Sequence, residues 1–441
     1  MMLPNHILDA ISRLESAGFA AYAVGGCVRD HVLGLQPADY DLSTSALPEQ
    51  IRQVFSDHRL VLAGIQHGTV SVVTDFGLVE ITTFRTEGGY GDTRHPDWVQ
   101  FVDDIELDLS RRDFTVNAMA FSPTRGFADP FGGREDLANG VLRCVGQPQL
   151  RFQEDALRIL RGVRFASRYR LTLEGKTREA MFLLTPLLNN LAWERVFDEL
   201  CKLLPTATAE DLLTYAPVLA QVVPELADCI GFQQRTPYHQ HDVYTHTAHV
   251  VAALPPDVAL RLAGLLHDIG KPTTFTLDDA GVGHFPDHAR VSADMADAAL
   301  RRLRASNSLR NRVVGLILHH MTPLTAEEKL LRRRLNQFGP EGVKDLLALQ
   351  RADHVGKGPG ADLSSFDEIQ KLLTQLLESE NCFRLKDLAV NGQDLLDLGF
   401  HPGKPLGSCL QWLLEQVLEQ ALPNEKNALL EAASRFPQRN T

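Results

Sequence analysis

Two aspartates and a glutamate near the start of the chain have a spacing that could hold a divalent cation. Asp39 and Asp41 lie in PADYDL, where residues two apart point to the same face if the segment is extended. Glu80 lies in a second β-like run, VEITTF. Oxygen ligands from two adjacent strands suit Mg²⁺, which keeps coordination positions for substrate phosphates. A D-x-D pair alone is common in ordinary loops, so the third acid is what favours a site for nucleotidyl transfer.

A glycine pair precedes these acids and could bring the backbone close to phosphate groups. AYAVGG predicts a strand that ends at Gly25 and Gly26, and CVRDHVLG predicts the start of a helix. The glycines would permit close approach, and the helix N-terminus would present free N–H groups to a triphosphate. Arg29 would add a charge-assisted contact. Because Gly-Gly at a strand end is unspecific by itself, this interpretation depends on the neighbouring acids.

The order and spacing of seven motifs resemble the class II tRNA nucleotidyltransferases, which include CCA-adding enzymes and bacterial poly(A) polymerases of the polymerase β superfamily. The resemblance covers roughly residues 20 to 200. The motifs are GGCVRD, ADYDL, HGTV, VEITTFR, RRDFTVNAMA, DPFGGREDL and RFQEDALRILRGVRFA. Several independent motifs in one order make chance agreement a poor explanation.

This resemblance implies an α+β fold, with a polymerase β-like nucleotidyltransferase head followed by an all-helical neck, body and tail. It implies transfer of CMP and AMP from CTP and ATP to a tRNA 3′ end without a nucleic-acid template. By the same likeness Asp39 and Asp41 hold the catalytic Mg²⁺ ions, and Glu80 is the third catalytic acid. Family members commonly have Lys before the first aspartate, where this chain has Ala38.

The segment RFQEDALRILRGVRFASR predicts one amphipathic helix from Phe152 to Arg168 whose polar side could select a base. The resemblance implies that Glu154, Asp155 and Arg158 contact the nucleotide, and that Arg161 and Arg164 face its triphosphate. Cytosine and adenine each present an amino donor beside a ring-nitrogen acceptor, which match a carboxylate and a guanidinium. Guanine and uracil would leave those buried partners unpaired. Ordinary ion pairs along a helix surface are the alternative interpretation.

Two further stretches belong to the implied nucleotide site. In RRDFTVNAMA we expect Arg112 and Asp113 to precede a strand and Asn117 to lie on it. The likeness implies that Arg112 contacts the nucleotide, while Asp113 and Asn117 help position the sugar; for Asn117 the alternative is a buried side chain that satisfies backbone groups. The segment Thr86 to Phe101 occupies the place of the family's flexible loop, and its glycines would permit motion between C-selecting and A-selecting states. In AWERVFDEL we expect Glu194 and Arg195 to brace the neck helices.

The C-terminal half contains histidines and aspartates that resemble the HD phosphohydrolase superfamily. His246, the pair His267-Asp268 and a later Asp353 lie in apolar helical patterns, and together they would offer mixed N/O ligation to a second divalent metal. His284, His288, His319 and His320 could supply another metal or line the site. Members of the nucleotidyltransferase family use such a domain either for phosphate ester hydrolysis or as structure alone, and a satisfied core histidine is the simplest alternative.

The elements that must position these residues divide the chain into four expected domains. Short β-like runs mix with helical ones up to residue 140, and the pattern is helical from there to the end. Pro205 and the stretch GKGPGADLSS mark further boundaries. We therefore expect a catalytic head at 1–140, a neck for base selection and RNA binding at 141–205, a body with the HD domain at 206–360, and a tail at 361–441.

Composition limits where the chain works and what it binds. No apolar run is long enough to span a bilayer, and six scattered cysteines fit free thiols, so a cytoplasmic protein without a membrane partner is expected. The net charge of −12 argues against nonspecific coating of nucleic acid. Two locally basic segments, 141–180 and 300–312, could track a phosphate backbone or be solvated helix faces. The sequence leaves the oligomeric state open.

The expected partners are tRNA, CTP and ATP, and full CCA addition is the leading interpretation. Three alternatives remain at this point: addition of the final A alone, poly(A) synthesis, and a chain that acts chiefly as an HD phosphohydrolase. The poly(A) alternative differs in the length of the tail made from ATP alone. The HD alternative would require a vestigial head, although each catalytic acid of the head is present.

Overall fold

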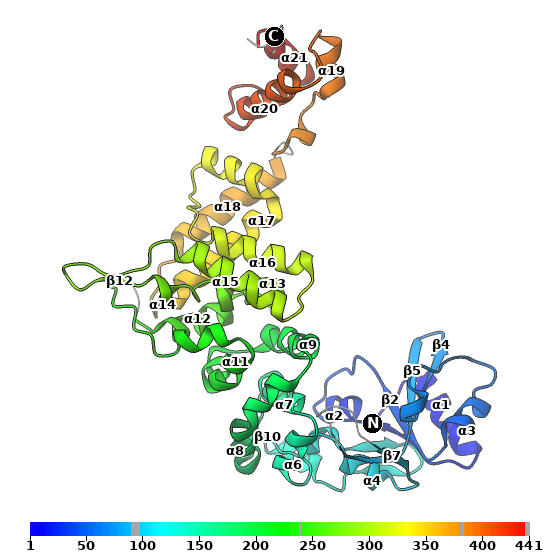
Figure 1. Cartoon of the computed structure of the whole chain (residues 1–441). Coiled ribbons are helices and arrows are strands. Elements are labelled where there is room, and N and C mark those ends of the chain that lie inside the picture. Colours follow the sequence, from blue (N-terminus) through cyan, green and yellow to red (C-terminus); the bar gives the residue numbers. More distant parts are fainter. Residues whose placement is uncertain (90–97, 238–239, 380–382, 437–441) are drawn as a thin grey trace. The chain divides into compact units, whose positions relative to one another are not determined.

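The computed structural model describes residues 1–89, 98–237, 240–379 and 383–436 of the 441-residue chain (Figure 1). These residues form two compact units. The N-terminal unit contains Met1–Ala207, Thr214–Ala227 and Arg302–Arg304, and the C-terminal unit contains Thr208–Leu213, Asp228–Arg301 and Ala305–Thr441. The mixed N-terminal part and the helical remainder confirm the predicted fold class. The finer division into four domains stays a prediction.

A seven-stranded sheet organises the first 130 residues, in the order β3-β4-β5-β2-β1-β8-β9. Its strands are β1 (Ala21–Val24), β2 (Asp41–Thr44), β3 (Arg59–Val61), β4 (Thr69–Thr74), β5 (Gly77–Thr83), β8 (Ala120–Ser122) and β9 (Gly126–Ala128). Three two-stranded sheets pair β6 (Arg85–Gly88) with β7 (Trp98–Phe101), β10 (Val141–Leu142) with β11 (Thr172–Leu173), and β12 (Thr276–Leu277) with β13 (Gly283–His284).

The central strands of the large sheet have the composition that burial requires. All four residues of β1, AYAV, are buried, and Tyr22 and Val24 pack in a cluster with Phe84. β1 runs antiparallel to β2, with Val24 opposite Asp41. β2 runs parallel to β5, with Asp41 opposite Glu80. The sheet therefore brings the end of β1 and two acids from separate strands to one place.

Helices cover this sheet and continue beyond it up to residue 207. They are α1 (Asn5–Ser16), α2 (Gly26–Val32), α3 (Pro48–Val54), α4 (Ile105–Ser110), α5 (Gly133–Ala138), α6 (Pro148–Glu154), α7 (Leu157–Tyr169), α8 (Gly175–Leu184) and α9 (Trp193–Leu203). Four short 3-10 turns lie among them, at Ile65–His67, Thr115–Asn117, Thr185–Asn190 and Leu204–Thr206.

Two sequence predictions about these elements were wrong. The single helix expected from Phe152 to Arg168 is two helices, because Asp155 is extended (φ −142°, ψ 102°) and its carboxylate accepts a hydrogen bond from the N–H of Leu157. Asn117 lies in a 3-10 turn rather than on a strand. There its amide bonds Asp113 at 3.0 Å, a local contact that competes with strand pairing.

The rest of the chain is almost entirely helical, as Figure 1 shows. Its helices are α10 (Ala209–Thr214), α11 (Ala216–Val222), α12 (Val243–Ala253), α13 (Val258–Leu266), α14 (Lys271–Thr274), α15 (His288–Arg302), α16 (Asn307–His319), α17 (Glu328–Gly356), α18 (Ser364–Ser379), α19 (Gly392–Asp397), α20 (Lys404–Leu418) and α21 (Lys426–Ser434). Further 3-10 turns span Pro224–Cys229 and Leu385–Asp387. α12 packs against α13 and α17, and α13 also contacts α16.

Local signals explain where the helices of this packed group begin and bend. Asp242 caps α12 by accepting from the N–H groups of Tyr244 and Thr245, and Asp257 caps α13. α17 consists of two helical segments joined at Gly339, which has a φ of 72° and directly precedes Pro340. The two caps mark the starts of the helices that lead to His246 and His267, and the kink lies in the helix that carries Asp353.

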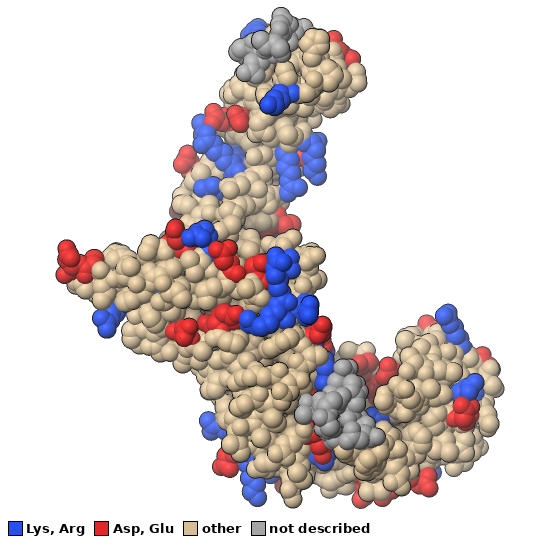
Figure 2. Space-filling view, viewed as in Figure 1, with Lys and Arg blue, Asp and Glu red and all other residues tan. Residues whose placement is uncertain are grey.

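The basic segment 300–312 contains arginines that are paired within the protein. Arg301 and Arg310 contact Asp297 at 2.7 and 3.0 Å, and Arg312 contacts Asp345 at 2.8 Å. Figure 2 shows acidic and basic side chains interspersed on the face in view. This pairing favours a solvated helix face for the segment.

Other expectations concern membranes, thiols and the family's flexible loop. In the part of the chain that the structure describes, no helix is both long and apolar enough to cross a membrane. Cys27, Cys144, Cys201 and Cys409 are free thiols. The loop expected at Thr86 to Phe101 has its ends in β6 and β7, and its centre, residues 90–97, lies outside the described residues.

Candidate active site

The three predicted catalytic acids lie together at the start of β2 and on the adjacent β5. We call Asp39, Asp41 and Glu80 the acidic triad. All three side chains are exposed, and Asp41 and Glu80 are direct neighbours across the parallel strand pair. Partial desolvation by the surrounding protein, then the charges of Asp39 and Glu80, raise the pKa of Asp41 to about 6. The triad is thus a solvent-facing concentration of negative charge.

The turn after β1 adjoins this triad and requires glycine. Gly25 has φ 72°, and a Cβ atom there would lie 2.7 Å from Nη1 of Arg112. Nε of Arg112 is buried and finds no hydrogen-bond partner among the described residues. The Arg112 charge also lowers the pKa of Asp41, against the effect of burial and the two acids. Arg112 therefore carries unused donor capacity beside the Gly25 turn, as a nucleotide contact requires.

Arg29 occupies a different environment from the one that a phosphate contact would need. It is 6% exposed, and its guanidinium donates to Asp30 at 2.6 Å and to Asn117 at 2.5 Å. It also lies 4.2 Å from the ring centre of Tyr169, with whose hydroxyl it shares a hydrogen bond. In this structure Arg29 joins α2 to α7, and its contact with phosphate stays a prediction. Gly26 begins α2 beside it.

Asp113 connects this network to the helix that follows. Its carboxylate accepts from Asn117 at 3.0 Å and from Arg161 at 2.6 Å. Burial would raise the pKa of Asp113, but the charge of Arg161 and the bond from Asn117 outweigh burial and lower the pKa to about 2. Asp113 is therefore ionised at neutral pH and anchors Arg161 beside the site.

The predicted base-selecting residues meet at the break between α6 and α7. Arg158 donates to Glu154 at 2.7 Å and to the carbonyl of Arg111 at 3.1 Å. Asp155 accepts from Arg195 at 2.9 Å, which joins α9 to this junction, while Glu194 is exposed; the bracing of the neck helices by Glu194 and Arg195 stays a prediction. Carboxylates and a guanidinium thus lie at one junction of two helices.

Sequence reasoning missed several partners of these residues. Arg151 pairs with Glu154 at 2.5 Å, and its spacing of three residues on a helix was the available signal. Arg164, expected to face the triphosphate, is buried and pairs with Glu199 at 2.6 Å. Nothing in the local sequence marks Glu199 as that partner. Arg164 therefore contributes to helix packing between α7 and α9 in this structure.

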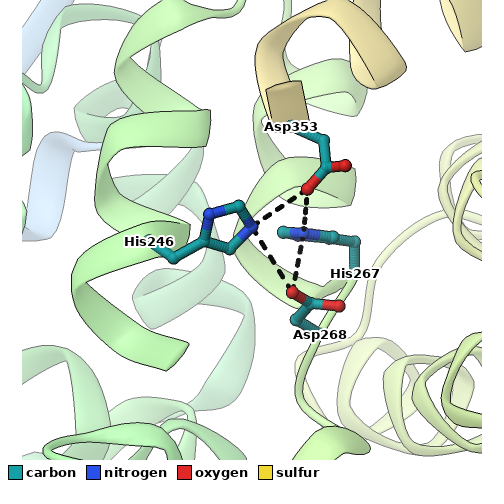
Figure 3. A group of neighbouring side chains, drawn as sticks. All are labelled: His246, His267, Asp268 and Asp353. Atoms are coloured by element: carbon teal, nitrogen blue, oxygen red, sulfur yellow. Dashed lines mark ion pairs between the residues drawn. The ribbon is translucent and has the colours of Figure 1, made fainter. Parts of the chain in front are cut away.

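A second group of chemically active side chains lies in the C-terminal unit. We call His246, His267, Asp268 and Asp353 the histidine–aspartate cluster, whose ligand atoms all lie within 4.8 Å of one another (Figure 3). Nε2 of His246 lies 3.0 Å from Asp353, and Nε2 of His267 lies 3.1 Å from Asp268. Burial opposes protonation of His267, but the charge of Asp268 outweighs burial and raises the pKa of His267 to about 10.

The cluster has a neighbouring group built on the same aspartate. Asp268, His288 and His320 also lie within 4.8 Å of one another, with both imidazoles nearest to Oδ1 of Asp268. His246, His267 and Lys271 instead lie nearest to Oδ2. His284 is exposed and pairs with Asp278, and the ring of His319 lies tilted against Phe338, so neither belongs to the two groups.

Backbone carbonyls fix the orientation of three of these imidazoles. Nδ1 of His267 donates to Gly264 at 2.8 Å, and the Nδ1 atoms of His288 and His320 donate to Phe285 and Ile317. This arrangement directs each Nε2 toward the cluster, as in protein metal sites. Among the described residues, Nε2 of His267 and both oxygens of Asp268 are buried and lie in ion pairs with each other and with Lys271, His288 and His320, but they make no well-aligned hydrogen bond. Such groups fit metal ligands better than satisfied core residues.

Two cavities adjoin this cluster. One, of about 270 Å³, is lined by Asp268, Lys271, His288 and Lys357, and the other, of about 330 Å³, by polar and apolar residues of 320–369. Both reach His320 and Asp353. Lys271, 2.7 Å from Asp268, and Lys357, 3.8 Å from Asp353, place two cationic groups at the first cavity, where a phosphate group could contact them.

Two family models match the first 230 residues of the chain. A model of the poly A polymerase head domain matches residues 21–143, and one of the RNA and SrmB-binding site of polymerase A matches residues 170–230. A third model, tRNA nucleotidyltransferase domain 2, matches residues 284–433. The sheet, the acidic triad and these models define a polymerase β-like nucleotidyltransferase.

Full-length relatives carry this identification further. The CCA-adding enzymes of Lactiplantibacillus plantarum and Latilactobacillus sakei are each 36% identical to the chain, over 96% and 97% of it and 94% and 96% of their own lengths. The crystal structure of the Bacillus stearothermophilus CCA-adding enzyme in complex with CTP has a TM-score of 0.70 and 28% identity, and covers 98% of this chain and 97% of its own. The chain belongs to the family of CCA-adding enzymes.

Proposed function

We propose that this chain builds the CCA end of tRNA by adding C, C and A from CTP and ATP, with the acidic triad as its catalytic centre. The observation that carries the proposal is the register of β2 and β5, which sets Asp41 beside Glu80 next to the Gly25 turn. In the reaction the RNA 3′ oxygen forms a bond to the α-phosphorus of the nucleotide. The bond to the β-phosphate bridging oxygen breaks, and pyrophosphate leaves.

The residues of the triad fit the divalent metal that the nucleotidyltransferase family implies. Partial desolvation, then the charges of Asp39 and Glu80, raise the pKa of Asp41, and the three exposed carboxylates form a donor set for a hard cation such as Mg²⁺. We assign the metal ligands to Asp39 and Asp41. A bound divalent cation would lower the pKa of the 3′ hydroxyl and offset charge on the phosphate oxygens. Glu80 adds negative charge at the same place.

The chain's own side chains bind and orient the nucleotide in this proposal. The backbone at Gly25 and Gly26 lets phosphates approach the start of α2, and Arg112 donates to them. Glu154, Asp155 and Arg158 present acceptors and a donor to the Watson–Crick edge, which match cytosine and adenine. Asp113 and Asn117 hold the sugar, and Arg29, Arg161 and Arg164 support the site as phosphate contacts or through the ion pairs described above.

Sequencing of reaction products tests the proposed function against its two closest alternatives. Transcripts of one tRNA ending before the CCA, after C and after CC are incubated with CTP and ATP. We expect each to end in CCA with no further addition. An enzyme that adds A alone would extend only the CC transcript, and a poly(A) polymerase would add long tails to a generic RNA from ATP. Either product would contradict the proposal.

A second candidate function is favoured by the buried ligand atoms of the histidine–aspartate cluster. We infer that His246, His267, Asp268 and Asp353 hold a divalent metal, with His288 and His320 available to a second ion on the other oxygen of Asp268. Mixed nitrogen and oxygen ligands suit transition metals as well as Mg²⁺. With Lys271 and Lys357 in the adjoining cavity, the expected chemistry is hydrolysis of a phosphate ester, as in HD proteins.

Hydrolysis of 2′,3′-cyclic nucleotides, compared between the wild type and His267→Ala, tests this second function. We expect wild-type hydrolysis with added divalent metal and none with the variant. CMP addition by the same preparations serves as the control for folding. If the wild type retains metal but hydrolyses no phosphate ester, the cluster has a structural role and the hydrolytic proposal fails.

A further inference from the structure

A fully buried carboxylate lies next to the proposed nucleotide site and has no part in the assignments above. Asp108 belongs to α4, and its relative exposure is 0%. A buried ionised carboxylate is costly unless charges and hydrogen bonds compensate it. Burial would raise the pKa of Asp108, but the charges of Arg111 and Arg112 outweigh burial, so the pKa lies below its ordinary value. Asp108 is therefore a buried anion.

The two oxygens of Asp108 hold different parts of the structure. Oδ1 accepts from the backbone N–H of Arg85 at 3.3 Å and from Nε and Nη2 of Arg111 at 3.0 and 2.9 Å. Oδ2 accepts from the hydroxyl of Ser43 at 3.3 Å and from Nη2 of Arg112 at 3.5 Å. Ser43 lies on β2, the strand that carries the catalytic acid. One carboxylate thus ties two consecutive arginines to the catalytic strand.

The arginine segment that Asp108 holds contacts both parts of the proposed nucleotide site. Nη1 of Arg112 lies against the Gly25 turn, and the carbonyl of Arg111 accepts from Arg158 at 3.1 Å. Adjacent guanidinium groups repel one another, so without a counter-charge Arg112 would be pushed toward solvent or toward other anions. Asp108 opposes this displacement from the buried side.

We propose that Asp108 is a positioning residue for nucleotide binding, which holds Arg112 at the Gly25 turn before the nucleotide arrives. Asp108 itself touches no substrate. Preorganising a donor in this way lowers the cost of binding rather than the barrier of the chemical step. This inference rests on the proposed assignment of Arg112 to the nucleotide.

Asp108→Asn tests the proposal because it keeps the side-chain shape and removes the charge. We expect KM for CTP and for ATP to rise about tenfold while kcat changes less than about twofold. The matched control is Asp136→Asn, since Asp136 is also buried but pairs with Arg143 at 3.1 Å and bonds Thr115. We expect the control to lower stability without changing KM. An unchanged KM in folded Asp108→Asn would overturn the proposal.

A double-mutant cycle with Arg112→Gln separates positioning from general loss of stability. If Asp108 acts through Arg112, Asp108→Asn raises KM less than about twofold in the Arg112→Gln background. Additive effects on KM would overturn the proposal. If Arg112→Gln alone leaves KM unchanged, the proposed contact between Arg112 and the nucleotide is wrong. If Arg112→Gln raises KM and Asp108→Asn does not, only the positioning role of Asp108 is wrong. If Asp108→Asn does not fold, Asp108→Glu replaces it in the cycle, because it keeps the buried charge but moves the carboxylate by one methylene and so displaces Arg112.

Discussion

The acidic triad and the histidine–aspartate cluster both bring carboxylates together, but the triad is exposed to solvent and most of the cluster is buried. Asp39, Asp41 and Glu80 are exposed and are not all within the 4.8 Å that defines the cluster; Asp41 and Glu80 lie on strands, and Asp39 lies just before β2. His267 and Asp268 are at most 1% exposed and lie at the end of a helix. The triad is suited to a cation that arrives with its substrate. The cluster is suited to one that stays bound.

This difference follows from the elements that supply the ligands. Neighbouring strands present side chains in register toward a shared surface, which leaves that surface open to a large substrate. Helices that pack around a core direct side chains inward, so ligands reach high local density only with loss of hydration. Exchange of metal should therefore be easy at the triad and slow at the cluster.

The largest expected effect is the loss of nucleotide addition when the triad is broken. Asp41→Ala removes a proposed metal ligand, and we expect CMP incorporation to fall about a thousandfold or more. Single-turnover incorporation into a tRNA that lacks CCA measures it. Asp75→Ala, a change at an exposed acid in the turn between β4 and β5, is the matched control. Near wild-type activity of Asp41→Ala would disprove the site.

Retention of metal tests whether the histidine–aspartate cluster releases its metal more slowly than the acidic triad does. After dialysis against EDTA at neutral pH, we expect the wild type to keep about one transition-metal ion per chain and His267→Ala to keep none, because buried mixed ligands release metal slowly. Elemental analysis by mass spectrometry measures the content. CMP addition should return fully when Mg²⁺ is restored to the dialysed wild type. Equal metal contents in the two proteins would refute the difference between the sites.

Selection of the nucleotide base tests the residues that surround the triad and not the triad itself. Arg158→Ala should lower the preference for CTP and ATP over UTP and GTP by about tenfold or more, since the guanidinium no longer reads the base edge. Values of kcat/KM for the four nucleotides check this prediction. Arg168→Ala, at an exposed position of the same helix, is the control and should keep the wild-type preference. Unchanged selectivity of Arg158→Ala would assign Arg158 to packing alone.

The smallest expected effect concerns stability and pH in the N-terminal unit. The pKa of Asp113 in the folded chain, about 2, lies below its ordinary value of 3.8, so its ion pairs stabilise the fold above pH 3.8. That contribution, about 2 kcal/mol, is lost as pH falls through 2. Urea unfolding of the wild type and Asp113→Asn should differ by this amount at pH 7. The difference in the free energy of unfolding between the two proteins should become smaller in acid. A difference that does not depend on pH would refute the ion-pair explanation.

Much of the catalytic centre could be predicted from the sequence because its signals are local. Gly25 ends a strand, Asp39 and Asp41 are two residues apart, and Glu80 lies in a clear β-like run. Asp242 and Asp257 begin the helices that lead to His246 and His267. Each of these features is readable within a window of about ten residues.

The partners of the arginines could not be predicted in this way. Arg29 bonds Asn117 across 88 positions, and Arg164 bonds Glu199 across 35. Such contacts depend on how helices pack, which no periodicity encodes. The break at Asp155 was missed for a related reason, since an extended backbone there is stabilised by Arg195 from another helix. Local pattern predicted a continuous helix, and tertiary contacts override that preference.

The parallel register of β2 and β5 also determines which changes in length the enzyme can accept. Side chains alternate between the two faces of a strand, so one inserted or deleted residue within β5 would turn Glu80 away from Asp41. The turn between β4 and β5 at Asp75 and Phe76 is exposed and lies at the far end of the hairpin. Chain grafts and reporter insertions therefore belong in that turn, where the strands on either side can keep their pairing.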